Sequence, residues 1–132
     1  MTARAHRLHI ALVPGRFAVC RLAPESPVPA WVDGSLFASV TRTRDELSVV
    51  CEEERVPPDA ICERDYAAMR VVGTLAPNLV GVLASLAGPL AEAHVPILAI
   101  GTYDTDYVLV RRDDLGRAVD ALRRAGHDLT DD

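Results

Sequence analysis

Hydrophobic and polar residues alternate in short runs along most of the chain, and two of those runs share one pattern. Residues 37–53 read FASVTRTRDELSVVCEE and residues 98–114 read LAIGTYDTDYVLVRRDD. Each is an apolar run, a polar turn of the form T-x-x-x-D and a second apolar run, which predicts a β-hairpin. An ungapped alignment places Thr41 on Thr102. A hairpin repeated after about 60 residues predicts two related α+β units, because a lone hairpin is marginal in water.

The N-terminal part contains strand patterns with little room for helices. Residues 7–13 alternate, Pro14-Gly15 follows, and residues 17–22 are mostly apolar, which together predict a further hairpin. Three prolines in residues 23–34 leave space for no more than one helical turn near Pro29–Val32. The acidic run at residues 52–54 predicts a solvated strand end that a basic partner could use.

The C-terminal part has a clearer helical periodicity. Leu79, Leu83, Leu86 and Leu90 recur at helical spacing and predict one apolar stripe. The predicted elements are a strand at 66–75, a helix at 78–93, hairpin strands at 96–101 and 106–111, a helix at 113–125 and a strand at 127–130.

This order of elements is β-α-β-β-α-β, the ferredoxin-like pattern. The predicted fold class is therefore α+β, with two ferredoxin-like units of which the N-terminal one keeps its strands and has degenerate helices. We expect the units to cover residues 7–63 and 64–130, since RVPPDA at residues 55–60 interrupts the strand pattern.

Composition narrows the classes of function. The net charge of −5 argues against binding to nucleic acid and to an anionic membrane surface. All fourteen basic residues are arginine, which excludes lysine chemistry. The three cysteines, Cys20, Cys51 and Cys62, form no C-x-x-C motif and predict reduced thiols in a cytoplasmic protein. No signal peptide or membrane-length apolar run is evident, and no motif indicates a metal, a cofactor or an enzyme.

Polar side chains gather in the turn GTYDTDY at residues 101–107. Its two carboxylates and two threonine hydroxyls could bind a cation, a guanidinium or an ammonium group. Aspartate and threonine also stabilise ordinary turns by bonding their own backbone. A metal or catalytic role for Asp104 and Asp106 is a third alternative, which the absence of a nearby histidine in the sequence disfavours.

The predicted helix at 78–93 has a second face. Gly81, Ser85 and Gly88 lie opposite the leucine stripe, where a ligand or another backbone could approach, or where the face could simply be solvated. Pro89 has no N–H to donate to the carbonyl of Ser85, so this carbonyl needs water, a side chain or a ligand as its partner.

One segment carries a family resemblance. Residues 89–115, PLAEAHVPILAIGTYDTDYVLVRRDDL, resemble the PLAE-x-H-V…STY-x-TD-F/Y-ILV motif of the ACT-like domains in CASTOR-type cytosolic arginine sensors and their short bacterial relatives. Weaker similarity extends over roughly residues 8–130. The regulatory ACT domains of aspartate kinases are a more distant comparison.

The resemblance implies a non-catalytic regulatory protein that binds an amino acid or a similar metabolite between modules, with conformational or allosteric effects on a regulated protein partner. Carried over by position, the ligand-binding residues would be Ser85, Leu86, Thr102, Tyr103, Asp104 and Asp106, with Asp106 facing a basic side chain. The sensors have four such units and this chain has two, so a complete site implies a homodimer. A structural or protein-interaction ACT domain without a ligand remains the alternative.

Overall fold

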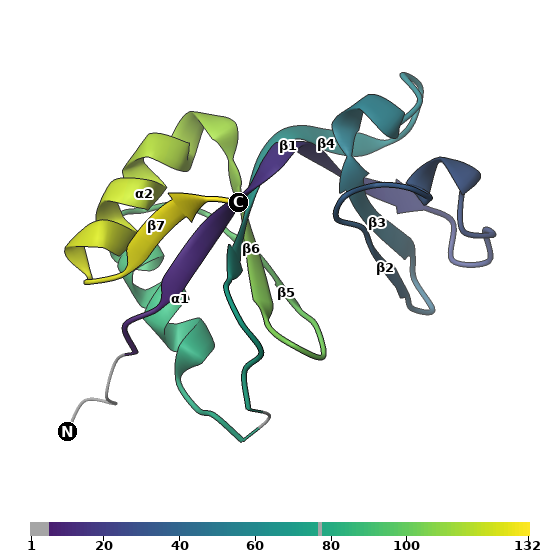
Figure 1. Cartoon of the computed structure of the whole chain (residues 1–132). Coiled ribbons are helices and arrows are strands. Elements are labelled where there is room, and N and C mark those ends of the chain that lie inside the picture. Colours follow the sequence, from purple (N-terminus) through teal and green to yellow (C-terminus); the bar gives the residue numbers. More distant parts are fainter. Residues whose placement is uncertain (1–5, 77) are drawn as a thin grey trace. The chain divides into compact units, whose positions relative to one another are not determined.

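The computed structural model describes residues 6–76 and 78–132 and contains two compact units (Figure 1). Unit 1 comprises the chain up to Pro14 together with Ala67–Asp132, and unit 2 comprises Gly15–Tyr66. This division differs from the predicted one at 63/64, since the first residues of the chain belong with the C-terminal unit. Strands β1 (His9–Leu22) and β4 (Cys62–Val71) each contribute to both units.

Unit 1 is a β-sheet with two helices packed on one face (Figure 1). Its other elements are α1 (Val82–Glu92), β5 (Leu98–Gly101), β6 (Asp106–Arg111), the 3₁₀ turn η3 (Arg112–Asp114), α2 (Leu115–Arg124) and β7 (Asp128–Asp131). The core lies between helices and sheet, where Leu90, Val110 and Leu122 are fully buried. The predicted helices, hairpin and final strand of this half are therefore confirmed, with helices shorter than predicted and the final strand displaced by one residue.

The strand order of unit 1 is β7-β1-β4-β6-β5. The β-α-β-β-α-β unit from β4 to β7 has the ferredoxin-like order, with the first half of β1 inserted between its first and last strands. β1 pairs parallel to β7, from the pair His9–Asp128 to the pair Leu12–Asp131. The α+β, ferredoxin-like fold class is thus confirmed.

Unit 2 has the same strand order with 3₁₀ turns in place of helices. The order β2-β3-β1-β4 uses β2 (Ser39–Arg42) and β3 (Leu47–Glu52), with η1 (Ala30–Val32) and η2 (Glu53–Arg55) between strands. The prolines of the connection before β2 permit only a single turn there, as predicted. The core of the unit is small and contains three cysteines, Cys20, Cys51 and the partly buried Cys62.

The hairpin predicted around Pro14-Gly15 is wrong, because β1 is one continuous strand. Gly15 has φ +104°, a conformation that glycine adopts without a steric penalty. Pro14 breaks no ladder bond, since β7 pairs with β1 no further than Leu12. The strand therefore tolerates both residues at the point where it leaves unit 1.

The β1–β4 ladder contains one extra residue in β1. The amide of Val72 donates to the carbonyl of His9, and the amide of Arg21 donates to the carbonyl of Ile61. Between these bonds β1 advances twelve residues and β4 eleven, which defines a β-bulge.

The apolar face of α1 is rotated relative to the predicted stripe. Leu79 and Leu83 are each 44 % exposed, and the helix begins only after Gly81, which has φ +84°. The buried face consists of four residues, Val82, Ser85, Leu86 and Leu90. Leu86 and Leu90 of the predicted stripe are therefore buried as expected, whereas Leu79 lies before the helix and Leu83 lies on its exposed side.

The repeated hairpin is present in both units. The structurally equivalent residues of the two hairpins are shifted by two positions from those that the ungapped sequence alignment pairs. The amide of Thr43 donates to the Glu46 carbonyl at 2.9 Å, and the amide of Thr102 donates to the Thr105 carbonyl at 2.8 Å. Thr43 and not Thr41 therefore corresponds to Thr102. A shift of two residues keeps the same side chains facing the core, so the hydrophobic pattern alone cannot detect it.

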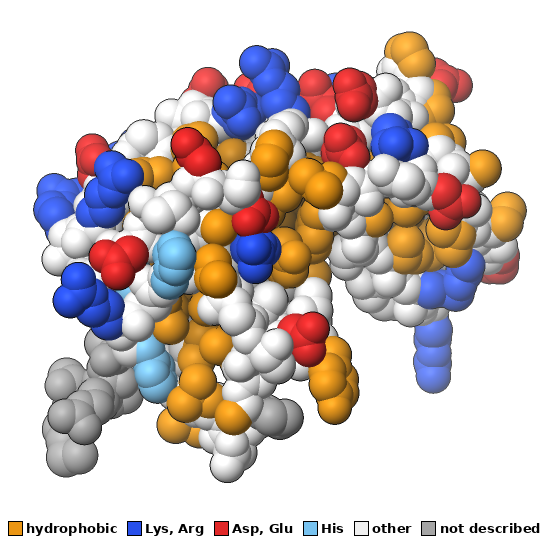
Figure 2. All heavy atoms as spheres, viewed as in Figure 1, with side chains coloured by type: hydrophobic (Ala, Val, Ile, Leu, Met, Phe, Trp, Pro, Cys, Tyr) orange, Lys and Arg blue, Asp and Glu red, His pale blue; other side chains and the backbone are white. Residues whose placement is uncertain are grey.

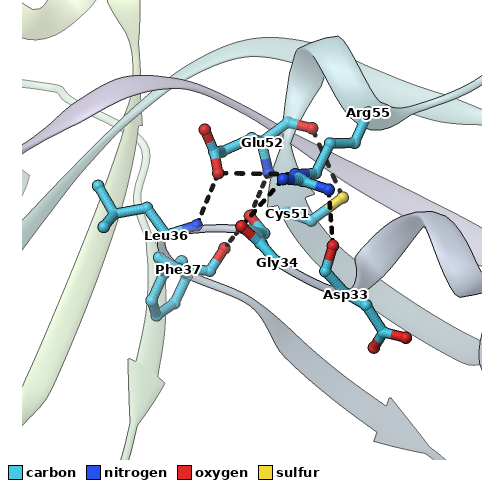
Figure 3. Close-up of polar contacts among 8 residues, drawn as sticks. Asp33, Gly34, Leu36, Phe37, Cys51, Glu52 and Arg55 are labelled. Atoms are coloured by element: carbon cyan, nitrogen blue, oxygen red, sulfur yellow. Dashed lines mark hydrogen bonds and ion pairs between the residues drawn. The ribbon is translucent and has the colours of Figure 1, made fainter.

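The acidic run after β3 has an internal structural role (Figure 3). Glu52 accepts a hydrogen bond from the Leu36 amide at 2.6 Å and lies 3.8 Å from the Arg55 guanidinium. Arg55 in turn donates to the carbonyls of Asp33 and Gly34 at 2.6 and 3.0 Å. These contacts hold the loop before β2 against the end of β3, so Glu52 is not a free acidic surface.

Candidate functional site

A pocket of about 160 Å³ lies in unit 1, between the β5–β6 turn and the segment that leads into α1. It contains four of the predicted site residues, Thr102, Tyr103, Asp104 and Asp106. The other lining residues are Leu75, Ala76, Leu79, Val82 and Thr105. We call this the carboxylate pocket.

The turn that forms one wall is folded by its own hydrogen bonds. The Thr102 hydroxyl accepts the Thr105 amide at 3.1 Å and lies 2.9 Å from the Thr105 carbonyl. The buried hydroxyl of Thr105 donates to the Val71 carbonyl at 2.7 Å, and the Leu75 amide donates to the Asp104 carbonyl at 2.7 Å. The threonines thus act as ordinary turn residues and fix the positions of the two aspartates.

The carboxylates of Asp104 and Asp106 set the charge of this wall. Across the residues that the structure describes, neither the Asp104 nor the Asp106 side chain has a hydrogen bond or an ion pair. No arginine or histidine of the described ranges lines the pocket. The wall therefore presents uncompensated negative charge, which suits an ammonium or guanidinium group.

Comparison of the two hairpins singles out Asp106. In the structural register Asp106 corresponds to Leu47, which is fully buried in unit 2. Asp106 is half-buried and begins β6 opposite Gly101, where a Cβ atom on the glycine would lie 3.5 Å from its Oδ1. A carboxylate at a position that is apolar in the other hairpin makes Asp106 a candidate site residue.

Apolar side chains surround the pocket. Tyr103 is 93 % exposed and Val80 is 81 % exposed, and Leu79, Leu83 and Val72 are also accessible. Figure 2 shows hydrophobic side chains gathered around the loop before α1 and the tip of the β5–β6 hairpin. This apolar rim is a surface of the kind that a ligand or a second chain covers.

Ser85 and Leu86 do not line the pocket, although the family motif places the ligand near them. Leu86 belongs to the core of unit 1. Ser85 is buried, and its hydroxyl donates to the Gly81 carbonyl at 2.8 Å and accepts the His6 amide at 3.0 Å. The helical residue that reaches the pocket is Val82, one turn earlier.

The Ser85 carbonyl finds its partner in His127, which is only 4 % exposed. The Nε2 atom of His127 lies 2.8 Å from this carbonyl, and its Nδ1 accepts the Leu8 amide at 3.0 Å. Because Nδ1 accepts, the proton sits on Nε2 and donates to Ser85. The Ser85 carbonyl, which Pro89 leaves without a helical donor, is therefore bonded by a side chain in this structure.

Sequence reasoning missed the apolar part of the pocket, Leu75, Leu79 and Val82. The available signal was Gly81, whose left-handed φ delays the start of α1 and leaves the preceding leucine beside the turn.

A larger pocket of about 360 Å³ lies elsewhere in unit 1, at the C-terminal ends of the two helices. Alanine side chains form much of its wall, and its charged residues are Glu92 and Arg124. It contains no predicted site residue, and its one acid is balanced by one base. The carboxylate pocket is the better candidate because its charge is unbalanced.

The residues that the structure describes are 6–76 and 78–132. They contain no group of three or more histidine, cysteine, aspartate or glutamate side chains placed to hold a metal ion. None of the helices in those ranges is both long and apolar enough to cross a membrane.

The chain is similar to proteins of known family. A family model of the ACT domain matches residues 61–124, and a second model, of an N-terminal domain, matches residues 15–59. The cytosolic arginine sensor for mTORC1 subunit 1 of Bos taurus is 32 % identical over 99 residues, which are 67 % of this chain and 30 % of the sensor. The chain therefore spans less than a third of the length of that relative.

Solved structures are also similar to this chain. Protein Atu0741 from Agobacterium tumefaciens has a TM-score of 0.91 at 35 % identity and is covered over 96 % of its length by 97 % of this chain. The aspartate kinase of Clostridium acetobutylicum has a TM-score of 0.69 at 16 % identity, where 96 % of this chain covers 36 % of the kinase. The second likeness concerns the fold alone. This chain belongs to the ACT domain family and is a relative of the cytosolic arginine sensors.

Proposed function

We propose that this protein is a non-catalytic regulatory ACT protein that binds an amino acid or similar small cation in the carboxylate pocket. The observation that carries the proposal is the unpartnered pair Asp104 and Asp106 beside an apolar wall. Carboxylates bind ammonium and guanidinium groups through charge-assisted hydrogen bonds. Its relationship to a protein named as an arginine sensor supports the same class of ligand.

Each residue of the pocket has a distinct part in this proposal. Asp106 meets the positive group of the ligand, and Asp104 adds negative charge at the rim. Leu79 and Val82 contact the aliphatic part, and Tyr103 covers the ligand from the exposed side. Thr102 keeps the turn in shape, while Ser85 and Leu86 support the start of α1 from within the core.

A second copy of the chain completes the site in this account. The apolar rim, which includes Val80, Leu83 and Tyr103, is exposed among the described residues. A homodimer that covers the rim would enclose the pocket and exclude water from the ion pair. Ligand binding would then shift the equilibrium between dimer conformations by its differential affinity for them, and so alter the contact with a regulated partner.

The second candidate is a protein-interaction ACT domain without a small ligand. The 93 % exposure of Tyr103 and the 81 % exposure of Val80 favour it, because such side chains are typical of protein interfaces. In that case the rim would bind another chain, and the aspartates would provide only the turn.

The two candidates differ in how they respond to loss of one charge. The test measures thermal shifts with each of the twenty amino acids and then titration calorimetry with any that stabilise the protein. In the first candidate Asp106→Asn weakens ligand binding about ten- to a hundredfold, because a hydrogen bond to a charged group contributes about 1.5–3 kcal/mol.

The matched control is Asp45→Asn, in the turn of the other hairpin, which leaves binding unchanged. Sedimentation of Asp106→Asn reports the dimer separately. If none of the twenty amino acids stabilises the protein and the dimer persists in Asp106→Asn, the result would favour the interaction domain and contradict the ligand site.

A further inference from the structure

Two of the three cysteines face each other across neighbouring strands of unit 2. The Arg21 amide donates to the Ile61 carbonyl at 2.9 Å, so these two residues form a hydrogen-bonded pair of the antiparallel β1–β4 ladder. The next pair along the ladder is Cys20 with Cys62, and it is of the non-hydrogen-bonded kind.

This pairing places the thiols within reach of a covalent bond. In a non-hydrogen-bonded antiparallel pair the Cα atoms lie about 4.5 Å apart, inside the range of about 4.4–6.8 Å that disulfides bridge. Cys20 and Cys62 also belong to the same hydrophobic cluster, so their side chains lie on one face of the sheet. The neighbouring Cys62 thiol is also among the groups that raise the pKa of Cys20, which agrees with the two thiols lying close together.

Cys51 provides an internal comparison. It lies on β3 opposite Ala18, and Cys20 lies opposite Val49. Cys51 is therefore a diagonal neighbour of Cys20 on the far side from Cys62, and such diagonal pairs are about 7–8 Å apart. All three thiols are free in the structure.

We propose that Cys20 and Cys62 are a reversible dithiol pair, which a low-molecular-weight disulfide oxidises to an intramolecular disulfide between β1 and β4. Cys62 is the attacking residue, because it is partly exposed while Cys20 is only 2 % exposed.

The exchange proceeds in two balanced steps. The Cys62 thiolate attacks one sulfur of the reagent, the S–S bond of the reagent breaks, and one reagent thiol leaves. Cys20 then gives its proton to solvent and attacks the Cys62 sulfur of the mixed disulfide, which releases the second reagent thiol. Two protein thiols are oxidised to one disulfide, and the reagent is reduced to two thiols.

The second step is the slow one. Burial raises the pKa of the Cys20 thiol to about 12, an effect that the neighbouring Cys62 and Cys51 reinforce and the Arg64 guanidinium opposes. Only the thiolate attacks, so the rate of closure rises with pH, about tenfold per unit, well above neutrality.

The sequence provides a direct assay. Cleavage after arginine releases the cysteines in three separate peptides, residues 17–21, 45–55 and 56–64. The folded full chain is incubated with oxidised glutathione at graded ratios to reduced glutathione, quenched by acid and alkylation, digested and analysed by mass spectrometry. The expected product links peptide 17–21 to peptide 56–64.

Three variants complete the test. Cys51→Ala forms the same link, Cys62→Ser forms none, and Cys20→Ala stops at a mixed disulfide with glutathione on Cys62. The oxidised wild type has a higher Tm than the reduced protein, and reductant reverses the change. The proposal is overturned if the wild type, folded by circular dichroism, accumulates only mixed disulfide, or if the principal link involves peptide 45–55.

Discussion

The buried hydrogen bonds of His127 allow a quantitative test of how unit 1 is held together. Replacing His127 with leucine removes the acceptor of the Leu8 amide and the donor to the Ser85 carbonyl while filling the space with an apolar side chain. Each buried polar group left without a partner costs about 1–3 kcal/mol. We expect His127→Leu to lower the free energy of unfolding by about 2–5 kcal/mol in urea denaturation.

The structure also predicts which change offsets this loss. Pro89 deprives the Ser85 carbonyl of its helical donor, so Pro89→Ala supplies an N–H that can donate to this carbonyl within α1. In the Pro89→Ala background, His127→Leu leaves only the Leu8 amide unpaired. Its cost should therefore be smaller by about 1–2 kcal/mol than in the wild type.

The control is His9→Leu, because His9 is exposed and bonds only the Thr130 hydroxyl among the described contacts. This variant should change stability by less than about 0.5 kcal/mol. Costs of His127→Leu that agree within about 0.5 kcal/mol in the two backgrounds would refute the reasoning, since they would show that the Ser85 carbonyl does not depend on His127.

Three further predictions concern single sites. Gly34→Ala should lower the Tm and weaken the Arg55 contacts, because Gly34 has φ +81° and an added Cβ would lie 3.1 Å from the Arg55 guanidinium. Thermal melts measure this effect against the control Gly88→Ala, whose added Cβ meets open space. Burial raises the pKa of Cys20 to about 12, so stability should fall as pH rises from about 9, where the unfolded thiol ionises first, and urea titrations of Cys20→Ala should show a shallower fall. Hydrogen bonds from Arg70 at 2.7 and 2.9 Å lower the pKa of Asp132. The contribution of this pair to the free energy of unfolding is therefore present above the unfolded pKa of the carboxyl group and disappears on acidification. Asp132→Asn should flatten the acid limb of the curve of stability against pH.

The repeated hairpin shows what the sequence could predict and why the register escaped it. Alternation and turn residues were sufficient to find both hairpins, since each buries one face. The correspondence of Thr43 with Thr102 depends on which residue closes the turn, and a two-residue shift leaves the alternation unchanged. The interpretation of Asp106 as a polar residue at a position of core type therefore required the structure.

The course of β1 could not be predicted from local pattern. Pro14-Gly15 has the composition of a turn, yet β1 continues because its partners change there, from β7 to β3. Such a change depends on residues more than 100 positions away in sequence, at Asp128–Asp131. Local propensity gave the wrong element because tertiary pairing decided it.

The candidate site was predicted in part for similar reasons. The turn residues Thr102 to Asp106 lie at the pocket, because a polar turn between two strands is a local feature. The role of Ser85 differs because its side chain and carbonyl are engaged by His6 and His127, at opposite ends of the chain. Those long-range partners leave no signal in the local sequence.

The central claim is that the charge of Asp106 binds a small cationic metabolite in the carboxylate pocket. Titration calorimetry of wild type and Asp106→Asn with arginine, lysine and citrulline, an arginine analogue with an uncharged side chain, tests it most directly. The account predicts heat of binding for at least one cationic amino acid in the wild type, with affinity reduced about tenfold or more in Asp106→Asn. Equal affinity in the two proteins, or tighter binding of citrulline than of arginine in the wild type, would contradict it.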